Sequence, residues 1–252
     1  MQAGIQISSF KPLMKDLSGL ERVLAFMKSI GCELTQLQWI DKAIAPEEVA
    51  AALKRYGIRA VGVQDKAYCL FDDPDYYVKL CRANGAKDIC LSGAVETGED
   101  RFLAGLTALR AREDARGLTF SYHPTKGDFD GALHRVMISC DGLRLTLDVC
   151  QAHDAGASLE DILRRYSGRV DAVHFKDRSS DGALCPVGQG VVNFETAARL
   201  CRLAGVKYLL TEQESWQDAF QELKQGFHYT QSLACKHSQA TICQTVIDLA
   251  KY

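Results

Sequence analysis

Four polar residues each close a short apolar run between residues 118 and 212. The runs are Leu118–His123, Leu143–Asp148, Val170–His174 and Tyr208–Glu212. Each run is typical of a buried β-strand, and if the strands are parallel neighbours their last side chains converge at one rim of the sheet. Imidazole and carboxylate groups gathered at one rim are the ligands of a divalent metal site.

Three of these residues can be weighed individually. Asp148 closes a buried run, where a carboxylate is costly unless it is paired, metal-bound or used to cap the next segment. A lone His174 would more often be structural, but its pairing with Asp148 one strand earlier favours a ligand. Glu212 and Glu214 share one face of an extended segment, so one could bind a metal while the other acts nearby.

The elements that must position these residues alternate along the chain, strand then helix. Helical patterns repeatedly end at a glycine that precedes the next strand, which fits βα units. The sequence therefore predicts an α/β fold, a (β/α)8 TIM barrel in a single domain over 1–252. The expected strands are 3–8, 33–38, 58–63, 86–91, 118–123, 143–148, 170–175 and 207–213, and the expected helices are 18–30, 46–56, 74–84, 99–116, 158–166 and 194–204, with one or two more in 216–252.

An open doubly wound sheet is the alternative architecture. It usually has fewer strands, and the first strand–helix turn, Ser8 to Pro12, is not a GxGxxG phosphate loop. The barrel is therefore the preferred prediction.

Composition narrows the function classes. The 252 residues include 30 basic and 32 acidic side chains, well mixed, for a net charge of −2. The absence of a basic patch argues against a nucleic-acid or anionic-membrane partner. The start has no signal-peptide pattern and no apolar run approaches ~18 residues, so a cytoplasmic protein is expected. The ten cysteines include no CxxC pair and are interpreted as reduced thiols in the core.

The chain resembles the xylose isomerase-like TIM-barrel superfamily, which includes sugar phosphate isomerases and epimerases, inosose dehydratase-type lyases and, more distantly, the endonuclease IV group. The resemblance is carried by an ordered set of motifs over about 95 residues, and the N-terminal half matches more loosely. The motifs are Ser-Tyr-His-Pro (121–124), Leu-Asp-Val-Cys-Gln-Ala-His-Asp-Ala-Gly (147–156), Val-His-Phe-Lys-Asp-Arg (173–178), Pro-Val-Gly-Gln-Gly-Val-Val-Asn-Phe (186–194) and Leu-Thr-Glu-Gln-Glu (210–214).

The resemblance implies four ligands for a divalent metal ion (Mn, Zn, Co or Mg). Asp148, His174 and Glu212 fall on three of those positions. The fourth is usually a Glu that ends the fifth strand, where this chain has His123. Some relatives carry Glu-Phe a few residues further on, where this chain has Asp128, so His123 and Asp128 are rival fourth ligands.

Several polar groups are candidates for substrate binding. Gln151 stands where many relatives have a His, which departs from the usual substrate contacts. Lys176 and Arg178 could pair with a phosphate or carboxylate of the substrate, unless Asp177 neutralises them. The Gly188–Gly190 loop could approach an anion or form a simple turn. Other candidates lie near the ends of the first three strands: Gln6, Gln36, Gln38, Gln64 and Lys66 as hydrogen-bonding groups for a polyol, and Phe10, Trp39 and Tyr68 as an apolar wall or core residues.

The leading hypothesis is metal-assisted proton abstraction next to the carbonyl of a small-molecule sugar or sugar phosphate, catalysed by an isomerase or epimerase. Glu212, or a partner such as Glu214 or Asp128, would remove the proton. Loss of a β-hydroxyl from the same enediolate would make the enzyme a dehydratase-type lyase.

Two other function classes are weighed. A catalytically degenerate binding barrel is an alternative, because His123 and Gln151 depart from the usual pattern. A DNA-repair endonuclease is disfavoured, because it would need many more ligands than six histidines in the whole chain provide. Homo-oligomerisation is left open.

Overall fold

Eight parallel strands close into a barrel in the computed structural model, which describes residues 1–215 and 218–235. The strand order around the barrel is β1-β10-β7-β6-β5-β4-β3-β2, and β1 closes the ring by pairing Gln2 with Tyr208 on β10. The strands are β1 (Gln2–Gln6), β2 (Leu34–Leu37), β3 (Arg59–Lys66), β4 (Asp88–Ser92), β5 (Thr119–His123), β6 (Arg144–Asp148), β7 (Val170–Phe175) and β10 (Tyr208–Thr211).

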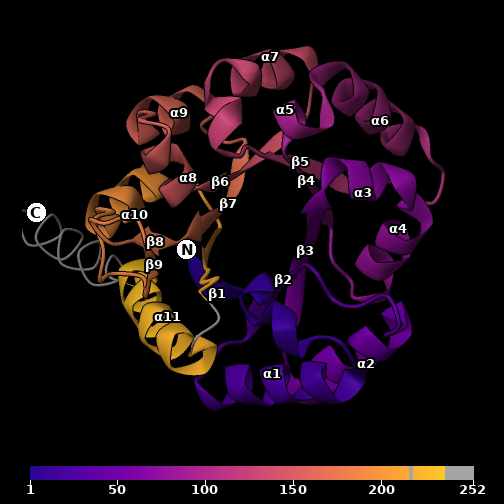
Figure 1. Ribbon diagram of the computed structural model, residues 1–252. Helices are drawn as coiled ribbons and strands as arrows, with labels where there is room; N and C mark the ends of the chain where they lie inside the picture. Colours follow the sequence, from indigo (N-terminus) through magenta and orange to yellow (C-terminus); the bar gives the residue numbers. More distant parts are fainter. Residues whose placement is uncertain (216–217, 236–252) are drawn as a thin grey trace, which may run out of the picture.

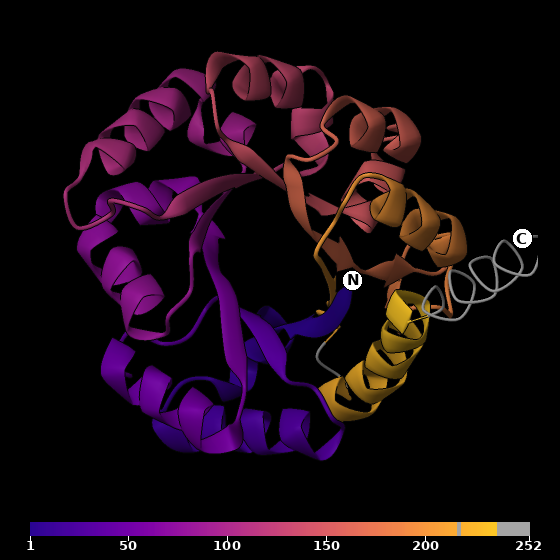
Figure 2. The ribbon, with the colours of Figure 1, turned by 180° about the vertical axis from the view of Figure 1, so that it is seen from behind.

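A ring of helices surrounds the strands (Figures 1 and 2). Local sequence sets their ends: α2 starts at Pro46 and is followed by Gly57 at a φ of 70°, and the Asp16 side chain caps α1 by accepting from the Gly19 amide at 2.8 Å. The ring helices are α1 (Leu17–Ser29), α2 (Pro46–Tyr56), α4 (Pro74–Ala83), α6 (Glu99–Ala111), α7 (Ala132–Ser139), α9 (Leu159–Arg165), α10 (Phe194–Leu203) and α11 (Ala219–Cys235).

Short elements follow several strands at the carboxyl-terminal end of the barrel. This is the end at which TIM barrels place their active sites. The short elements are η1 (Ile7–Leu13), α3 (Ala67–Asp72), α5 (Ala94–Thr97), η2 (Lys126–Phe129), α8 (Val149–Asp154) and the two-stranded hairpin of β8 (Asp177–Arg178) and β9 (Leu184–Cys185).

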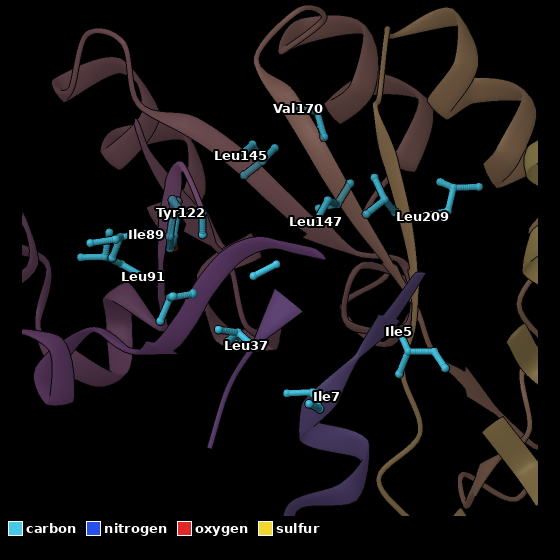
Figure 3. Packing of buried hydrophobic residues seen from close by; sticks show 14 of the residues in the cluster. Ile5, Ile7, Leu37, Ile89, Leu91, Tyr122, Leu145, Leu147, Val170 and Leu209 are labelled. Atoms are coloured by element: carbon cyan, nitrogen blue, oxygen red, sulfur yellow. The ribbon is translucent and has the colours of Figure 1, made fainter. Parts of the chain in front are cut away.

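The main hydrophobic core includes apolar side chains from alternate strand positions, several of which Figure 3 labels. On β6, Leu145 and Leu147 belong to this core, while Thr146 and Asp148 point to the other face, inside the barrel. The hydrogen bond between Gln36 on β2 and His174 on β7 crosses the barrel, because these two strands are not neighbours. The interior thus contains a buried polar layer in place of the branched apolar side chains that dominate most such barrels.

The predicted barrel is confirmed, and each predicted strand is present with ends shifted by no more than three residues. The first strand stops at Gln6, because Ile7–Leu13 forms a 3₁₀ helix, and α6 stops at Ala111 and not at residue 116. Helix α7 and the short helices α3, α5 and α8 were missed. Of the predicted segment 216–252, α11 covers Ala219–Cys235, and residues 236–252 lie outside the described ones.

Nine of the ten cysteines fall in the part of the chain that the structure describes, and all nine are free thiols. None of the helices described is long and apolar enough to cross a membrane.

Candidate metal centre at the barrel mouth

Three of the four predicted strand-end residues form one cluster, and the fourth, Glu212, lies beside it with Oε2 3.0 Å from His174 Nδ1. One ligand atom each from His123, Asp148 and His174 lie within 4.8 Å of one another, and all three side chains are buried. They end or nearly end the consecutive strands β5, β6 and β7, and Asp148 is the register partner of His174. The two imidazole rings lie 4.9 Å apart, centre to centre. The predicted convergence is therefore real for these three residues.

Asp148 caps the helix that follows it, one of the roles that the sequence offered for this residue. Its Oδ1 atom caps α8 by accepting hydrogen bonds from the amides of Cys150 at 2.7 Å and Gln151 at 3.0 Å. Burial raises the pKa of the Asp148 carboxyl, while the nearby Lys176 opposes the shift. A cap uses one oxygen, so the carboxylate can both hold the helix and face the two histidines.

The tautomer of His174 follows from its contact with Gln36. The Nε2 atom lies 2.7 Å from Gln36 Oε1, which only accepts hydrogen bonds, so Nε2 carries the proton. Gln36 Oε1 also accepts from Gln6 Nε2 at 3.0 Å, which fixes the orientation of the Gln36 amide. With the proton on Nε2, the Nδ1 atom of an uncharged ring would present a lone pair to the cluster.

Several buried polar atoms around this cluster have no hydrogen-bond partner among the described residues. They are both ring nitrogens of His123, one of which carries a lone pair in the neutral ring, together with His174 Nδ1 and Glu212 Oε2. The last two lie 3.0 Å apart without the alignment of a hydrogen bond. Unpaired buried acceptors are costly, and a divalent cation held by mixed nitrogen and oxygen ligands would satisfy them. The residues present therefore fit a metal ion.

His123 is suited to ligation by its protonation state. Burial lowers the pKa of His123 to about 3. A neutral imidazole is the form that binds metals. Between the two rival fourth ligands, the structure places His123 with Asp148 and His174.

Asp128 is held elsewhere. Its Oδ1 atom accepts from the Val95 amide at 2.7 Å, and its Oδ2 atom accepts from the Thr125 amide at 2.7 Å and the Thr125 hydroxyl at 3.0 Å. The side chain is completely buried in these contacts, which join the segment after β4 to the segment after β5. The structure does not bring Asp128 into the cluster, because its oxygens stabilise these two loops.

Glu212 lies beside the cluster and is held by Lys176. The Lys176 ammonium donates to Glu212 Oε1 at 3.1 Å and also to Glu214 Oε2. Burial alone would raise the pKa of Glu212, but the Lys176 ammonium holds this pKa well below its usual range. Burial likewise opposes the charge of Lys176, yet Glu212, Asp148 and Glu214 raise its pKa above the ordinary value. An ion-paired lysine with two carboxylates thus borders the candidate metal site.

The glycine loop already contains an anion. The Asp177 carboxylate accepts hydrogen bonds from the amides of Gly188 at 2.9 Å, Gly190 at 2.8 Å and Val192 at 3.2 Å. A Cβ atom at Gly190 would lie 2.2 Å from the Arg178 carbonyl oxygen, so only glycine fits there. Asp177 therefore fills this loop and leaves Arg178 to another partner.

The two remaining predicted anion or substrate contacts are also engaged. Arg178 pairs with Asp154 at 2.7 Å. The side-chain oxygen of Gln151 accepts from the Lys126 amide at 2.9 Å. Neither group is brought into the metal-ligand cluster.

The predicted polyol contacts separate into two places. Gln6, Gln36 and Gln64 form the hydrogen-bonded layer inside the barrel. Gln38 and Trp39 line a cavity of about 250 Å³ beyond the ends of β2 and β3. Asp65, Tyr76 and Tyr77 also line this cavity and were missed, since Asp65 follows the polar Gln64 and does not directly close the apolar run.

Two of the remaining predicted contacts lie outside this cavity. Lys66 pairs with Glu96 at 2.6 Å. Phe10 packs in the core against Phe26 and Phe220, at centroid distances of 5.7 and 5.3 Å, so core packing is the correct interpretation for this residue.

Comparison with solved structures shows which proteins share this fold. No family model matches the chain, and no curated protein matches its sequence. Among solved structures, a sugar phosphate isomerase/epimerase from Parabacteroides distasonis ATCC 8503 superimposes with a TM-score of 0.71 at 17% identity, covering 91% of this chain and 93% of that one. The chain shares the fold of the sugar isomerase and epimerase barrels. The resemblance to xylose isomerase-like barrels is thereby confirmed at the level of fold.

Two further structures support the same fold. L-ribulose 3-epimerase has a TM-score of 0.72 at 15% identity, with coverage of 95% of this chain and 97% of that one. The IOLI protein, whose structure was solved with a binding zinc atom, has a TM-score of 0.69 at 14% identity, covering 92% and 98%. At these identities the likeness establishes the architecture, and the chemistry must be argued from the site itself.

Proposed function

We propose that this protein is a divalent-metal-dependent isomerase or epimerase that removes a proton next to the carbonyl of an open-chain sugar. One observation carries the proposal: the unpaired buried lone pairs of His123, His174 and Glu212 lie beside the Lys176 ion pairs. Asp148 completes the ligand set. Manganese, zinc, cobalt and magnesium all suit such donors. A bound ion would act as a Lewis acid for the negative charge that develops on the substrate oxygens.

The chain supplies the proton acceptor. Glu212 is held at Oε1, which accepts from Lys176, and its Oε2, unpaired among the described residues, faces His174 and the ligand cluster. The Glu214 side chain is 19% exposed and also contacts Lys176, so it is the carboxylate that a substrate in the mouth can reach. We assign Glu214 as the base and Glu212 as a ligand. Asp128 takes no part, because its oxygens are bound to Val95 and Thr125.

The proposed step breaks the C–H bond next to the carbonyl. The proton goes to the Glu214 carboxylate, and the electron pair moves to the carbonyl oxygen to give an enediolate. Lys176 stands within reach to donate a hydrogen bond to that oxygen. Return of the proton to the neighbouring carbon isomerises the sugar, and return to the opposite face of the same carbon epimerises it. Loss of a β-hydroxide from the enediolate would make the reaction a dehydration.

Metal binding is the first test of this proposal. We expect about one equivalent of Mn²⁺ or Zn²⁺ by elemental analysis of the purified protein or after reconstitution. His174→Ala should abolish that binding, whereas the control His153→Gln, which alters an exposed histidine on α8, should retain it. If the wild-type protein takes up no metal after addition of either ion, the proposal fails and a binding barrel remains.

Solvent exchange tests the chemical step. Incubation of the metal-loaded protein with ketoses in D₂O should place deuterium next to the carbonyl, as followed by NMR. In Glu214→Gln the exchange rate should fall by at least about 100-fold, the lower range of general-base contributions. Metal affinity should be unchanged in this variant. Exchange at the wild-type rate in Glu214→Gln would remove Glu214 from its assigned role.

A further inference from the structure

Most cations at the barrel mouth are already neutralised by the protein. A substrate phosphate would need Arg, Lys or free backbone amides to offset its charge. Four basic side chains in this region each have a carboxylate partner, whereas Lys11, which also lines the β2–β3 cavity, contacts the Trp39 ring. The pairs are Lys176 with Glu212 and Glu214, Arg178 with Asp154, Lys66 with Glu96, and Lys42 with Asp73.

Backbone amides are equally committed. The glycine loop at 188–190 is the segment whose sequence suggests phosphate binding, and its amides bind the Asp177 carboxylate. Asp177 is 1% exposed, so the carboxylate is sealed into the loop. A phosphate could bind there only by displacing a buried anion.

The β2–β3 cavity is lined by Gln38, Trp39, Asp65, Tyr76 and Tyr77. Unlike the glycine loop, it contains polar groups that have no hydrogen-bond partner in the described part of the chain. Gln38 is 5% exposed and its Oε1 atom has no hydrogen-bond partner among the described residues. The Tyr76 hydroxyl is buried and equally unpaired within that part of the chain. Asp65 adds a carboxylate, oriented by the Tyr77 hydroxyl that donates to it at 2.7 Å. These groups suit the hydroxyls of a polyol, and the carboxylate would repel a phosphate.

Size and backbone strain support a binding role for this cavity. Its volume of about 250 Å³ equals the liquid volume of about eight waters at ~30 Å³ each, enough for several hydroxylated carbons. Trp39, which lines it, has a φ of 56° and is the sole non-glycine residue with positive φ among residues 1–215 and 218–235. Such strained positions cluster at ligand sites. The aromatic side chains provide the apolar lining that small-molecule sites use.

A short series of glutamine contacts connects this cavity with the candidate metal centre. Gln64 lines the cavity and accepts from Gln6 Nε2 at 3.5 Å. Gln6 donates to Gln36, which in turn holds His174. The cavity and the candidate metal centre therefore lie at the two ends of one hydrogen-bonded series.

We propose that the substrate is an unphosphorylated polyhydroxy aldehyde or ketone whose hydroxylated tail binds in the β2–β3 cavity. This inference rests on the proposed function and specifies its substrate class. Asp65, Gln38 and Tyr76 bind the tail hydroxyls, and Trp39 packs against its carbon chain. Lys11, whose ammonium lies 4.2 Å from the centre of the Trp39 ring, is the basic group that a phosphate would recruit.

The D₂O exchange assay on metal-loaded protein tests this inference. The probes are D-xylulose, D-ribulose and D-fructose, each compared with its terminal phosphate ester. We expect exchange on at least one free sugar, with kcat/KM at least tenfold above that of its ester. A higher kcat/KM for the esters overturns the substrate class and leaves the proposed function intact. No exchange with either set, while metal is bound, contradicts the proposed function and this inference with it.

Variants locate the tail within the cavity. Asp65→Asn and Gln38→Leu should each raise KM for the free sugar by about tenfold or more and change kcat by less than threefold, as expected for uniform binding contacts. Thermal melts confirm folding of each variant. Unchanged KM in both folded variants would remove the cavity from substrate binding. If Lys11→Met lowers kcat/KM on an ester more than tenfold and on the free sugar by less, a phosphate site is present and the inference is wrong.

Discussion

Replacing Gln36 by leucine should weaken metal binding without altering any of the candidate ligands. Gln36 Oε1 accepts hydrogen bonds from His174 Nε2 at 2.7 Å and from Gln6 Nε2 at 3.0 Å. Leucine would leave the Nε2–H group of His174 unpaired and allow the ring to rotate or to change tautomer, which would turn Nδ1 from an acceptor into a donor. Loss of such an orienting partner typically costs about 10- to 100-fold in metal affinity, or about 1.4–2.8 kcal/mol.

The fold should be destabilised at the same time. Two buried donors would lose their partner, at about 1–3 kcal/mol each. The free energy of unfolding of Gln36→Leu should therefore fall by roughly 2–6 kcal/mol. A loss in the lower half of this range is expected, because the two donors can move towards other partners. Gln36→Glu is the matched variant, since a carboxylate still accepts from both donors. It should retain metal affinity within about threefold and lose less stability.

Competition with a chromophoric chelator measures Zn²⁺ affinity of the wild-type protein and both variants, and urea unfolding of the metal-free proteins measures stability. Gln6→Leu is a useful control, because it removes a neighbour of Gln36 and leaves the contact to His174. The reasoning is refuted if folded Gln36→Leu binds Zn²⁺ as tightly as the wild-type protein. It is also refuted if Gln6→Leu and Gln36→Leu lose affinity equally.

Three further predictions concern charge and stability. Lys176→Met leaves the buried carboxylate of Glu212 unpaired, so the variant should lose about 3–5 kcal/mol at pH 7 and regain stability as the pH falls and the carboxylate is protonated. In the wild-type protein the depressed pKa of Glu212 has the opposite effect on stability. The ionised carboxylate stabilises the folded state above pH ~4.3, and this stabilisation is lost as the pH falls further. Burial raises the pKa of Asp88 to about 6, although hydrogen bonds from two hydroxyls oppose the shift. Asp88→Asn should therefore stabilise the protein by about 1–2 kcal/mol above pH ~6, a figure that allows for the partial exposure of this residue. This gain in stability should vanish near pH ~4. Asp177→Ala releases the amides of the 188–192 loop and should make that loop the first site of limited proteolysis.

Each of these predictions has a distinct contrary outcome. Urea unfolding between pH 4 and 8 decides the first two: a Lys176→Met protein that weakens further on acidification, or an Asp88→Asn protein with the same gain at pH 4 and pH 8, would contradict them. For Asp177→Ala, mass spectrometry of the fragments gives the answer. Cleavage that begins elsewhere at the wild-type rate would show that the loop is held by other contacts.

The strand ends could be predicted from the sequence because a change from apolar to polar residues is visible within a short stretch of chain. A polar residue that closes an apolar run, such as Asp148 or His174, needs no tertiary information to be recognised as unusual. Convergence then follows from parallel strands in one barrel. The choice between His123 and Asp128 was beyond this reasoning, because it depends on which loop amides capture the Asp128 carboxylate.

Other parts of the mouth depend on partners distant in sequence. Lys176 and Arg178 have sequence patterns typical of anion-binding groups, yet Glu212, Glu214 and Asp154 neutralise them across the fold. Asp65, in the β2–β3 cavity, was equally hidden because α4 supplies its tyrosine partner. Side-chain pairing between separate elements is set by packing, which periodicity along the chain does not encode.

Closure of the ring by its first and last strands makes the candidate metal centre a late product of synthesis. Gln2 on β1 pairs with Tyr208 on β10, so the first strand has no partner on that side until more than 200 residues have been made. At about 5–20 residues per second this interval is roughly 10–40 s on the ribosome. Glu212 follows the closing strand directly. Acquisition of a full ligand set would therefore mark the moment when the nascent chain completes its barrel.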